Sequence, residues 1–243
     1  MRTRISRGLA AALAVSALSL TAACGGGAKE DTKKDGADKP AAGATTSAAP
    51  TSEAPAAPLT DAQMKAAALE VKDLPSGWKA KKGEDDKSDY KSDKAECQPL
   101  ADMISANVPG ATKGASVDFV IGNNASELSQ EVMTFAGTGA ADYTKKIATA
   151  LDACTSFSVE TEGQKMKLGV EKLTAPQGAE EVLAFRFALE VSPGITIKPK
   201  LLVGRQGTGA FRMVHLADAA KAEKDFDGLA KTATEKFAKA AQS

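Results

Sequence analysis

The stretch EVLAFRFALE, residues 181–190, alternates large apolar side chains with small or charged ones. Leucine or phenylalanine stands at 183, 185, 187 and 189, and Ala184, Arg186 and Ala188 stand between them. Successive side chains of a β-strand point to opposite faces, so this period of two predicts a strand with one buried face.

Two similar runs follow at 195–203 and 211–213, and the short turns SPG (192–194) and RQGTG (205–209) separate the three runs. Alternating runs joined by glycine-containing turns are typical of an antiparallel meander. Pro199 has no amide hydrogen, so it suggests a bulge or an edge position in its strand. The sequence therefore predicts three adjacent antiparallel strands.

A long amphipathic helix is predicted after the strands, over residues 218–241. Its apolar side chains recur at helical spacing and form one stripe, made by Ala222, Phe226, Leu229, Ala230, Ala233 and Phe237. We expect this stripe to cover the apolar side of the sheet.

Shorter elements are predicted upstream. Thr60 and Gln63 have the spacing of a capping box, so a helix begins there. A second helix is entered through Pro99, and residues 116–121 and 129–137 favour neighbouring strands. Helices and antiparallel strands in this order predict an α+β domain.

Two cysteines of the domain are expected to form a structural disulfide. Residues 141–154 predict an amphipathic helix whose apolar stripe includes Cys154, so this side chain points toward the core. Cys97 is the remaining cysteine of the domain, and disulfides persist in exported proteins. The bond would stabilise the fold by about 4 kcal/mol in the chain-entropy model.

The N-terminus has the order of a secretory signal peptide over residues 1–23. Arg2, Arg4 and Arg7 precede an apolar segment, and small residues lead to Cys24. The segment resembles the lipobox of bacterial lipoproteins, in which this cysteine carries a diacylglyceryl group. We expect Cys24 to anchor the protein to the outer face of the cytoplasmic membrane, because two acyl chains suffice for stable attachment.

Residues 24–58 form a predicted tether, and residues 59–243 form a single domain. After Cys24 the tether contains no Val, Ile, Leu, Met or aromatic residue, so it cannot bury enough apolar area to order itself. The precursor has 31 basic and 31 acidic residues, and removing three arginines leaves a mildly acidic mature chain. This balance argues against binding to nucleic acid.

The sequence offers little support for metal or enzyme chemistry. Residues 81–96 are highly charged but lack the ligand spacing and glycine of a calcium loop, so we predict a solvated loop and no metal or cofactor. His215 is the one histidine of the chain, and parity places it on the apolar side of its strand. Typical His-rich zinc sites and Cys–His catalysis are therefore disfavoured, whereas a pair of catalytic carboxylates has no spacing rule and stays open.

Several segments carry a resemblance to a known family: DLPSGWK (73–79), ECQPLADM (96–103), ALDAC (150–154), EVLAFRFALE (181–190) and LLVGRQGTGAFRMV (201–214). In this order they resemble actinobacterial lipoproteins related to the extracellular sensor domains of mycobacterial receptor serine/threonine kinases. The resemblance implies a bent antiparallel sheet with helices packed on one face, a ligand cleft and no known catalysis. The kinase sensor domains carry two disulfides, whereas this domain has cysteines for one.

Three functions follow for this anchored domain. The first is a non-enzymatic sensor or ligand-binding domain, the second a carrier of lipids or other hydrophobic envelope molecules, and the third a wall hydrolase. A shallow polar cleft would favour the sensor, a large apolar cavity the carrier, and converging carboxylates the hydrolase.

Four basic residues are candidates for ligand binding. If the three C-terminal runs are adjacent, their shared polar face carries Arg186, Lys198, Lys200 and Arg212, with Glu190 nearby. Such an excess of cations can hold an anionic envelope component through charge-assisted hydrogen bonds. The alternative is an ordinary solvated face of the sheet. No protein partner is indicated.

Overall fold

A computed structural model describes residues 57–83, 87–122, 126–192, 194–217 and 219–243, with the side chains of the last helix described from Asp225 onward. The predicted signal peptide (1–23), Cys24 and nearly all of the predicted tether (24–58) lie outside the described residues. Among the described residues, no helix has the length and apolar character needed to cross a membrane.

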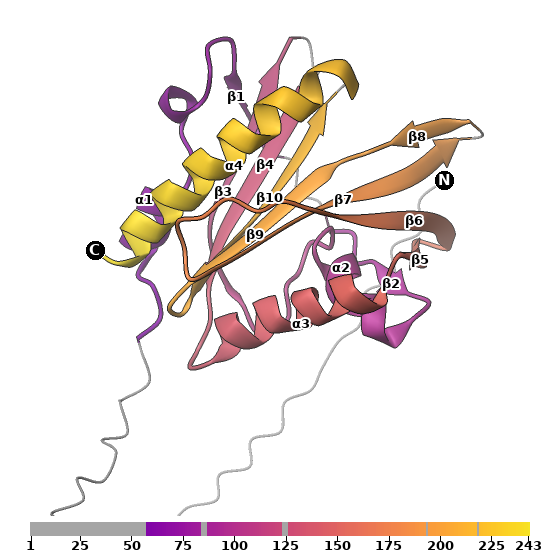
Figure 1. The fold of residues 1–243 in the computed structure, drawn as a ribbon. Coiled ribbons are helices and arrows are strands. Elements are labelled where there is room, and N and C mark those ends of the chain that lie inside the picture. Colours follow the sequence, from indigo (N-terminus) through magenta and orange to yellow (C-terminus); the bar gives the residue numbers. More distant parts are fainter. Residues whose placement is uncertain (1–56, 84–86, 123–125, 193, 218) are drawn as a thin grey trace, which may run out of the picture. The chain divides into compact units, whose positions relative to one another are not determined.

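The strands of the described chain form one antiparallel sheet (Figure 1). Its order is β1-β3-β4-β10-β9-β7-β6-β5-β2, and β8 pairs with β7. The strands β5, β6 and β7 splay away from β3, β4 and β10, so the sheet is bent. The bounds are β1 (Lys79–Lys81), β2 (Lys91–Ser92), β3 (Thr112–Ile121), β4 (Ser126–Thr134), β5 (Ser156–Thr161), β6 (Gln164–Leu173), β7 (Glu181–Ser192), β8 (Ile195–Ile197), β9 (Lys200–Gln206) and β10 (Gly209–Ala217).

The predicted C-terminal meander is confirmed. β7 pairs with both β8 and β9, and β9 pairs with β10. Pro199 lies between β8 and β9, where the amide of Phe187 donates to its carbonyl oxygen at 3.0 Å. The proline therefore interrupts one long return strand without changing its register, because Leu189 pairs with Ile197 and Arg186 with Lys200.

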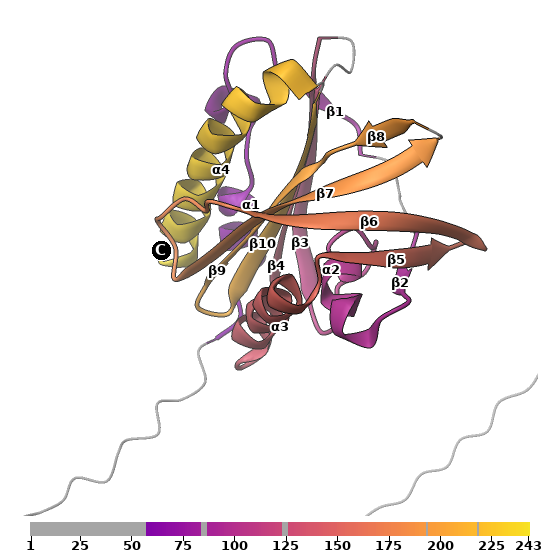
Figure 2. The same ribbon diagram turned by 45° about the vertical axis from the view of Figure 1, so that its right-hand side comes forward.

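Helices cover both faces of the sheet (Figures 1 and 2). They are α1 (Asp61–Ala67), α2 (Gln98–Asp102), α3 (Gly139–Ala153) and α4 (Ala219–Ala241), with short 3-10 turns η1 (Val71–Asp73) and η2 (Ala95–Cys97). We call the face under α1 and α4 the α4 face, and the opposite one the α3 face. The predicted α+β class, antiparallel sheet and covering C-terminal helix are confirmed.

The expectation that the helices pack on one face needs a correction, and β9 shows why. Its Leu202 belongs to the core under α4, whereas Leu201 and Val203 belong to the core under α3. Consecutive apolar residues in a strand bury both of its faces. Each face therefore needs its own helical cover.

The helix ends follow the predicted local chemistry. The hydroxyl of Thr60 accepts a hydrogen bond from the amide of Gln63 at 3.2 Å, and the Gln63 side chain accepts one from the amide of Thr60 at 2.9 Å. On α4 the predicted apolar residues from Phe226 onward are buried: Phe226, Leu229, Ala230, Ala233 and Phe237. These contacts fix α1 and α4 on their face of the sheet.

The predicted disulfide is present in the structure. Cys97 and Cys154 are both buried, and their Cα atoms lie 6.0 Å apart. The bond joins the start of α2 to the end of α3, so it fastens the two helices of the α3 face to each other.

The charged segment 81–96 is more ordered than the prediction of a solvated loop. Lys91 and Ser92 form β2, which pairs with Glu160 and Val159 of β5, and η2 follows. A two-residue edge strand is too short to show a period in the sequence. Residues 84–86 lie outside the described part.

Candidate functional site

Three of the predicted basic residues share the α4 face. Arg186 of β7 pairs with Lys200 of β9, and Lys200 pairs with His215 of β10. Paired residues of an antiparallel sheet point to the same face. Arg186, Lys200 and His215 therefore form one continuous line across three strands, which we call the basic row. The continuous register places Lys198 on the same face, opposite Ala188.

Arg212 does not belong to this group. It pairs with Val203 and Glu131, so it lies on the α3 face. Its guanidinium forms a 2.5 Å ion pair with Glu131, and both side chains are only 12% exposed. It also donates to the carbonyl oxygens of Asp102 and Met103, at 2.9 and 3.3 Å. Arg212 thus fastens α2 to the sheet.

The prediction of one polar face with four cations is therefore wrong for Arg212. On β7 the α4 face is only partly buried from Arg186 onward, whereas on β10 the same face is buried under α4. Arg186 consequently shares its face with His215 and Met213, the apolar side of β10, and not with Arg212.

The outer end of the basic row borders an open depression of about 220 Å³. Its lining residues are Thr155, Gly169, Val170, Glu171, Arg186, Ala188 and Lys198. Gly169 and Ala188 are cross-strand partners, and their small size leaves room between the longer side chains. Arg186 pairs with Glu171 at 2.5 Å, so Lys198 supplies the excess positive charge here.

The inner end of the row is buried and aromatic. Lys200 is 8% exposed and His215 is 1% exposed. The Lys200 ammonium lies 5.3 Å from the ring centre of Phe226, which stacks on His215 at 6.2 Å. Trp78 lies on another side of His215, with ring centres 6.1 Å apart. The position predicted for His215, on the apolar side of its strand, agrees with this arrangement, and Trp78 is itself buried.

The electrostatics of this inner end are unusual. Neither ring nitrogen of His215 has a hydrogen-bond partner among the described residues. Burial lowers the pKa of His215 to about 4, with a smaller effect of Lys200 in the same direction and an opposing one from Asp225. His215 is therefore neutral at neutral pH. Among the described residues, no carboxylate lies within ion-pair distance of Lys200.

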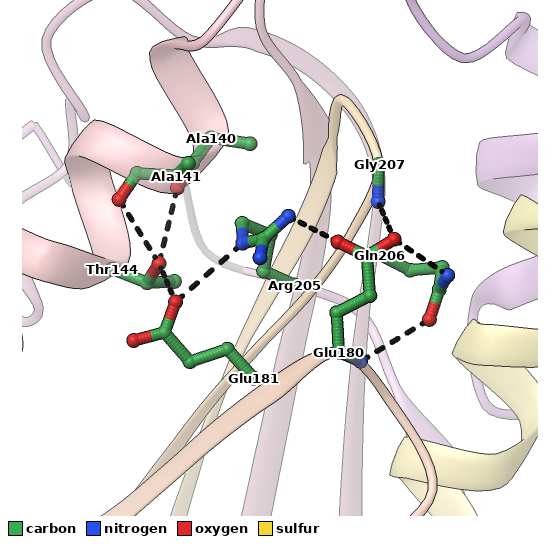
Figure 3. Close-up of polar contacts among 8 residues, drawn as sticks. All are labelled: Ala140, Ala141, Thr144, Glu180, Glu181, Arg205, Gln206 and Gly207. Atoms are coloured by element: carbon green, nitrogen blue, oxygen red, sulfur yellow. Dashed lines mark hydrogen bonds and ion pairs between the residues drawn. The ribbon is translucent and has the colours of Figure 1, made fainter.

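Arg205 is a further basic residue, which the sequence pattern did not indicate as a candidate. Its guanidinium is paired with two carboxylates (Figure 3). On the α3 face it pairs with Glu180 and, at 3.5 Å, with Glu181. The Glu181 carboxylate accepts from the Thr144 hydroxyl of α3 at 2.5 Å, and Glu180 accepts from the amide of Gly207 at 3.2 Å. This network fastens α3 to the sheet.

Other depressions lie outside the basic row. One of about 630 Å³ lies between α1 and β3, and a neighbour of about 460 Å³ shares Leu69, Glu70, Ser116 and Val117 with it. A third, of about 390 Å³, lies between α2 and α3 and is lined by the carboxylates of Asp102 and Asp142. Burial raises the pKa of Asp102. This is the place where the hydrolase alternative would act.

No group of histidine, cysteine or acidic side chains suited to a metal ion occurs within the described ranges. The basic row and its border thus offer three groups that can bind a ligand: the exposed cation of Lys198, the shielded cation of Lys200 and the neutral imidazole of His215.

Comparison with known proteins finds solved structures that are similar to this fold. The extracellular domain of PknH from Mycobacterium tuberculosis superimposes with a TM-score of 0.55 at 12% sequence identity, over 77% of this chain and 99% of that domain. The chain shares its fold with this extracellular domain. The resemblance stated from the sequence is thus confirmed at the level of fold.

A second similar structure is a protein of Mycobacterium smegmatis described as the Rv0999 ortholog, with a TM-score of 0.43 and 12% identity over 75% of this chain and 95% of that one. No protein-family model matches the sequence. No curated protein matches it either.

Proposed function

We propose that this protein is a non-enzymatic, extracytoplasmic binding domain, which a lipid on Cys24 holds at the outer face of the cytoplasmic membrane. The signal-peptide pattern of residues 1–23, the cysteine at position 24 and the disulfide of the domain support export and anchoring. The shared fold with an extracellular domain is consistent with this location.

We further propose that the ligand is an anionic component of the envelope and that it first meets the outer end of the basic row. One observation carries this proposal: exposed Lys198 and part-buried Arg186 lead along one face to Lys200, a shielded cation without a carboxylate partner among the described residues. An anion that approaches this row gains charge-assisted hydrogen bonds.

The carrier alternative would need a large apolar cavity between sheet and helices. In the described residues these spaces hold two cores of buried side chains, with Phe226 and Phe237 on the α4 face and Phe185 and Phe187 on the α3 face. The depressions at the surface have charged residues in their lining. These features favour a binding domain over a carrier.

The test uses the double variant Arg186→Ala, Lys198→Ala with two probes, phosphatidylglycerol vesicles and soluble poly(glycerol phosphate). Each lost charge-assisted bond is worth about 1.5–3 kcal/mol, so binding should weaken by about tenfold or more at low salt. The matched control is Lys72→Ala, Lys231→Ala, which removes two exposed lysines elsewhere. Equal binding by wild type, variant and control, or binding by none, would contradict the proposal.

A further inference from the structure

His215 is a buried polar side chain without partners. It is 1% exposed, and both of its ring nitrogens lack a hydrogen bond. More than nine in ten buried polar groups in proteins have a partner, and an exception calls for an explanation such as an ion or ligand. Within the described part of the chain, no side chain satisfies this ring.

Lys200 is the cross-strand neighbour of His215, and no carboxylate of the described residues lies within ion-pair distance of it. It is 8% exposed, and its ammonium faces the ring of Phe226. A ring face offsets only part of the cost of burying a charge. Two neighbouring side chains on adjacent strands, an imidazole with an unpaired N–H and a lysine cation, thus lie without a carboxylate partner among the described residues.

The surroundings leave this demand unmet on every described side. β4 contributes Leu128, which pairs with His215, and the turn before β1 contributes Trp78. α4 contributes Phe226, with Asp225 acting on His215 through space and outside ion-pair distance of Lys200. Among the side chains that the structure describes, the local charges are the Lys200 cation and, at a distance, the partly exposed carboxylate of Asp225.

We propose that Lys200 and His215 form an inner anion site that binds a phosphate group, either free or as part of a lipid headgroup. This proposal rests on the proposed function, because the outer end of the basic row delivers the anion. A phosphate has several acceptor oxygens, so it can accept from the Lys200 ammonium and from a ring N–H of His215 at once.

Binding at this inner site has two structural consequences. Phe226 stacks on His215 and covers Lys200, so its ring has to move when the phosphate enters. A bound anion favours the charged imidazolium, so binding is coupled to the uptake of one proton from solvent by His215. The affinity therefore rises as the pH falls from the pKa of the bound state to that of the free state, about 4.

Two natural reporters make the test direct, since His215 is the one histidine and Trp78 the one tryptophan of the chain. The NMR titration of His215 and the emission of Trp78 are followed in the purified protein with inorganic phosphate, phosphatidylglycerol vesicles or phosphatidylcholine vesicles. Inorganic phosphate or phosphatidylglycerol should move the His215 midpoint from about 4 to about 5 or above, with a change in Trp78 emission. A response to phosphatidylglycerol vesicles without a response to inorganic phosphate identifies a lipid headgroup as the source of the bound phosphate.

Variants separate the inner site from the outer one. Lys200→Met should abolish both responses, and Lys200→Arg should retain them. Lys231→Met is the control, because it removes an exposed lysine of α4. If Lys200→Met does not fold, His215→Gln with the Trp78 readout replaces it. Suppose that the wild-type protein binds the probe through Arg186 and Lys198 but that the titration midpoint of His215 does not change. This result overturns the inner site alone. No binding of any probe overturns the proposed function as well.

Discussion

His215 couples the stability of the domain to pH through a single side chain. Its pKa is about 4 in the folded protein against an ordinary value of 6.5. Between these values the unfolded chain binds a proton that the folded chain does not, so stability falls as the pH falls from 6.5 to 4. The full loss is about 3 kcal/mol and is absent above pH 6.5.

The variant His215→Leu should remove this part of the acid response. Denaturant unfolding at pH 7 and pH 4 measures the change in each protein. The difference between the two pH values should be smaller in the variant by about 3 kcal/mol, because no imidazole remains to be protonated in the unfolded state. An identical difference in both proteins would assign the acid response to the carboxylates.

Arg186 and Arg212 are equivalent in the sequence pattern but should differ strongly on mutation. Arg212→Met leaves Glu131 without its close partner in a site where both side chains are 12% exposed, and it frees two carbonyl oxygens. The free energy of unfolding should fall by about 2–4 kcal/mol. Arg186→Met breaks a pair in which Glu171 is 59% exposed and Arg186 22% exposed, and it should cost about 0–1 kcal/mol. Similar losses in the two variants would contradict this placement.

At the scale of elements, the disulfide holds α2 and α3 together. α2 has five residues and is bounded by Cys97, so it depends on this bond and on Arg212 for its position. Cys97→Ala and Cys154→Ala should each lower the stability by about 2–4 kcal/mol, and the double variant should cost little more. Thermal unfolding measures this, and thiol titration of the wild type should find neither of these two cysteines free.

The division of helices between the two faces is also decided at this scale. The stripe of α4 and the apolar side of α3 are each visible in the sequence as a helical period. The consecutive apolar residues of β9 are buried on both faces of the sheet, so one helix has to pack on each face. The local pattern predicts that a helix packs on a sheet but not on which side.

At the scale of the whole molecule, attachment to the membrane is proposed to depend on Cys24 and not on the folded domain. Cys24→Ser should release the protein from membranes or leave an unprocessed precursor, because a single acylated residue supplies the attachment. Fractionation of cells with immunoblotting distinguishes these outcomes. A processed Cys24→Ser protein that still sediments with membranes would argue against the lipid anchor.

The sequence by itself determined the features that depend on near neighbours in the chain. The period of residues 181–190, the capping box at Thr60 and the apolar stripe of α4 all act within a few residues, so their patterns predict strands and helices directly. The disulfide was also predictable, because the domain has two cysteines and one of them lies on a helix stripe.

Only the tertiary structure decided which side chains meet. The separation of Arg212 from Arg186, and the pairing of Lys200 with His215, follow from the registers of β7, β9 and β10. A register joins residues far apart in sequence, and a shift by one residue would exchange the faces of every side chain. The same alternating pattern therefore fits several arrangements, and the packing of two cores selects one of them.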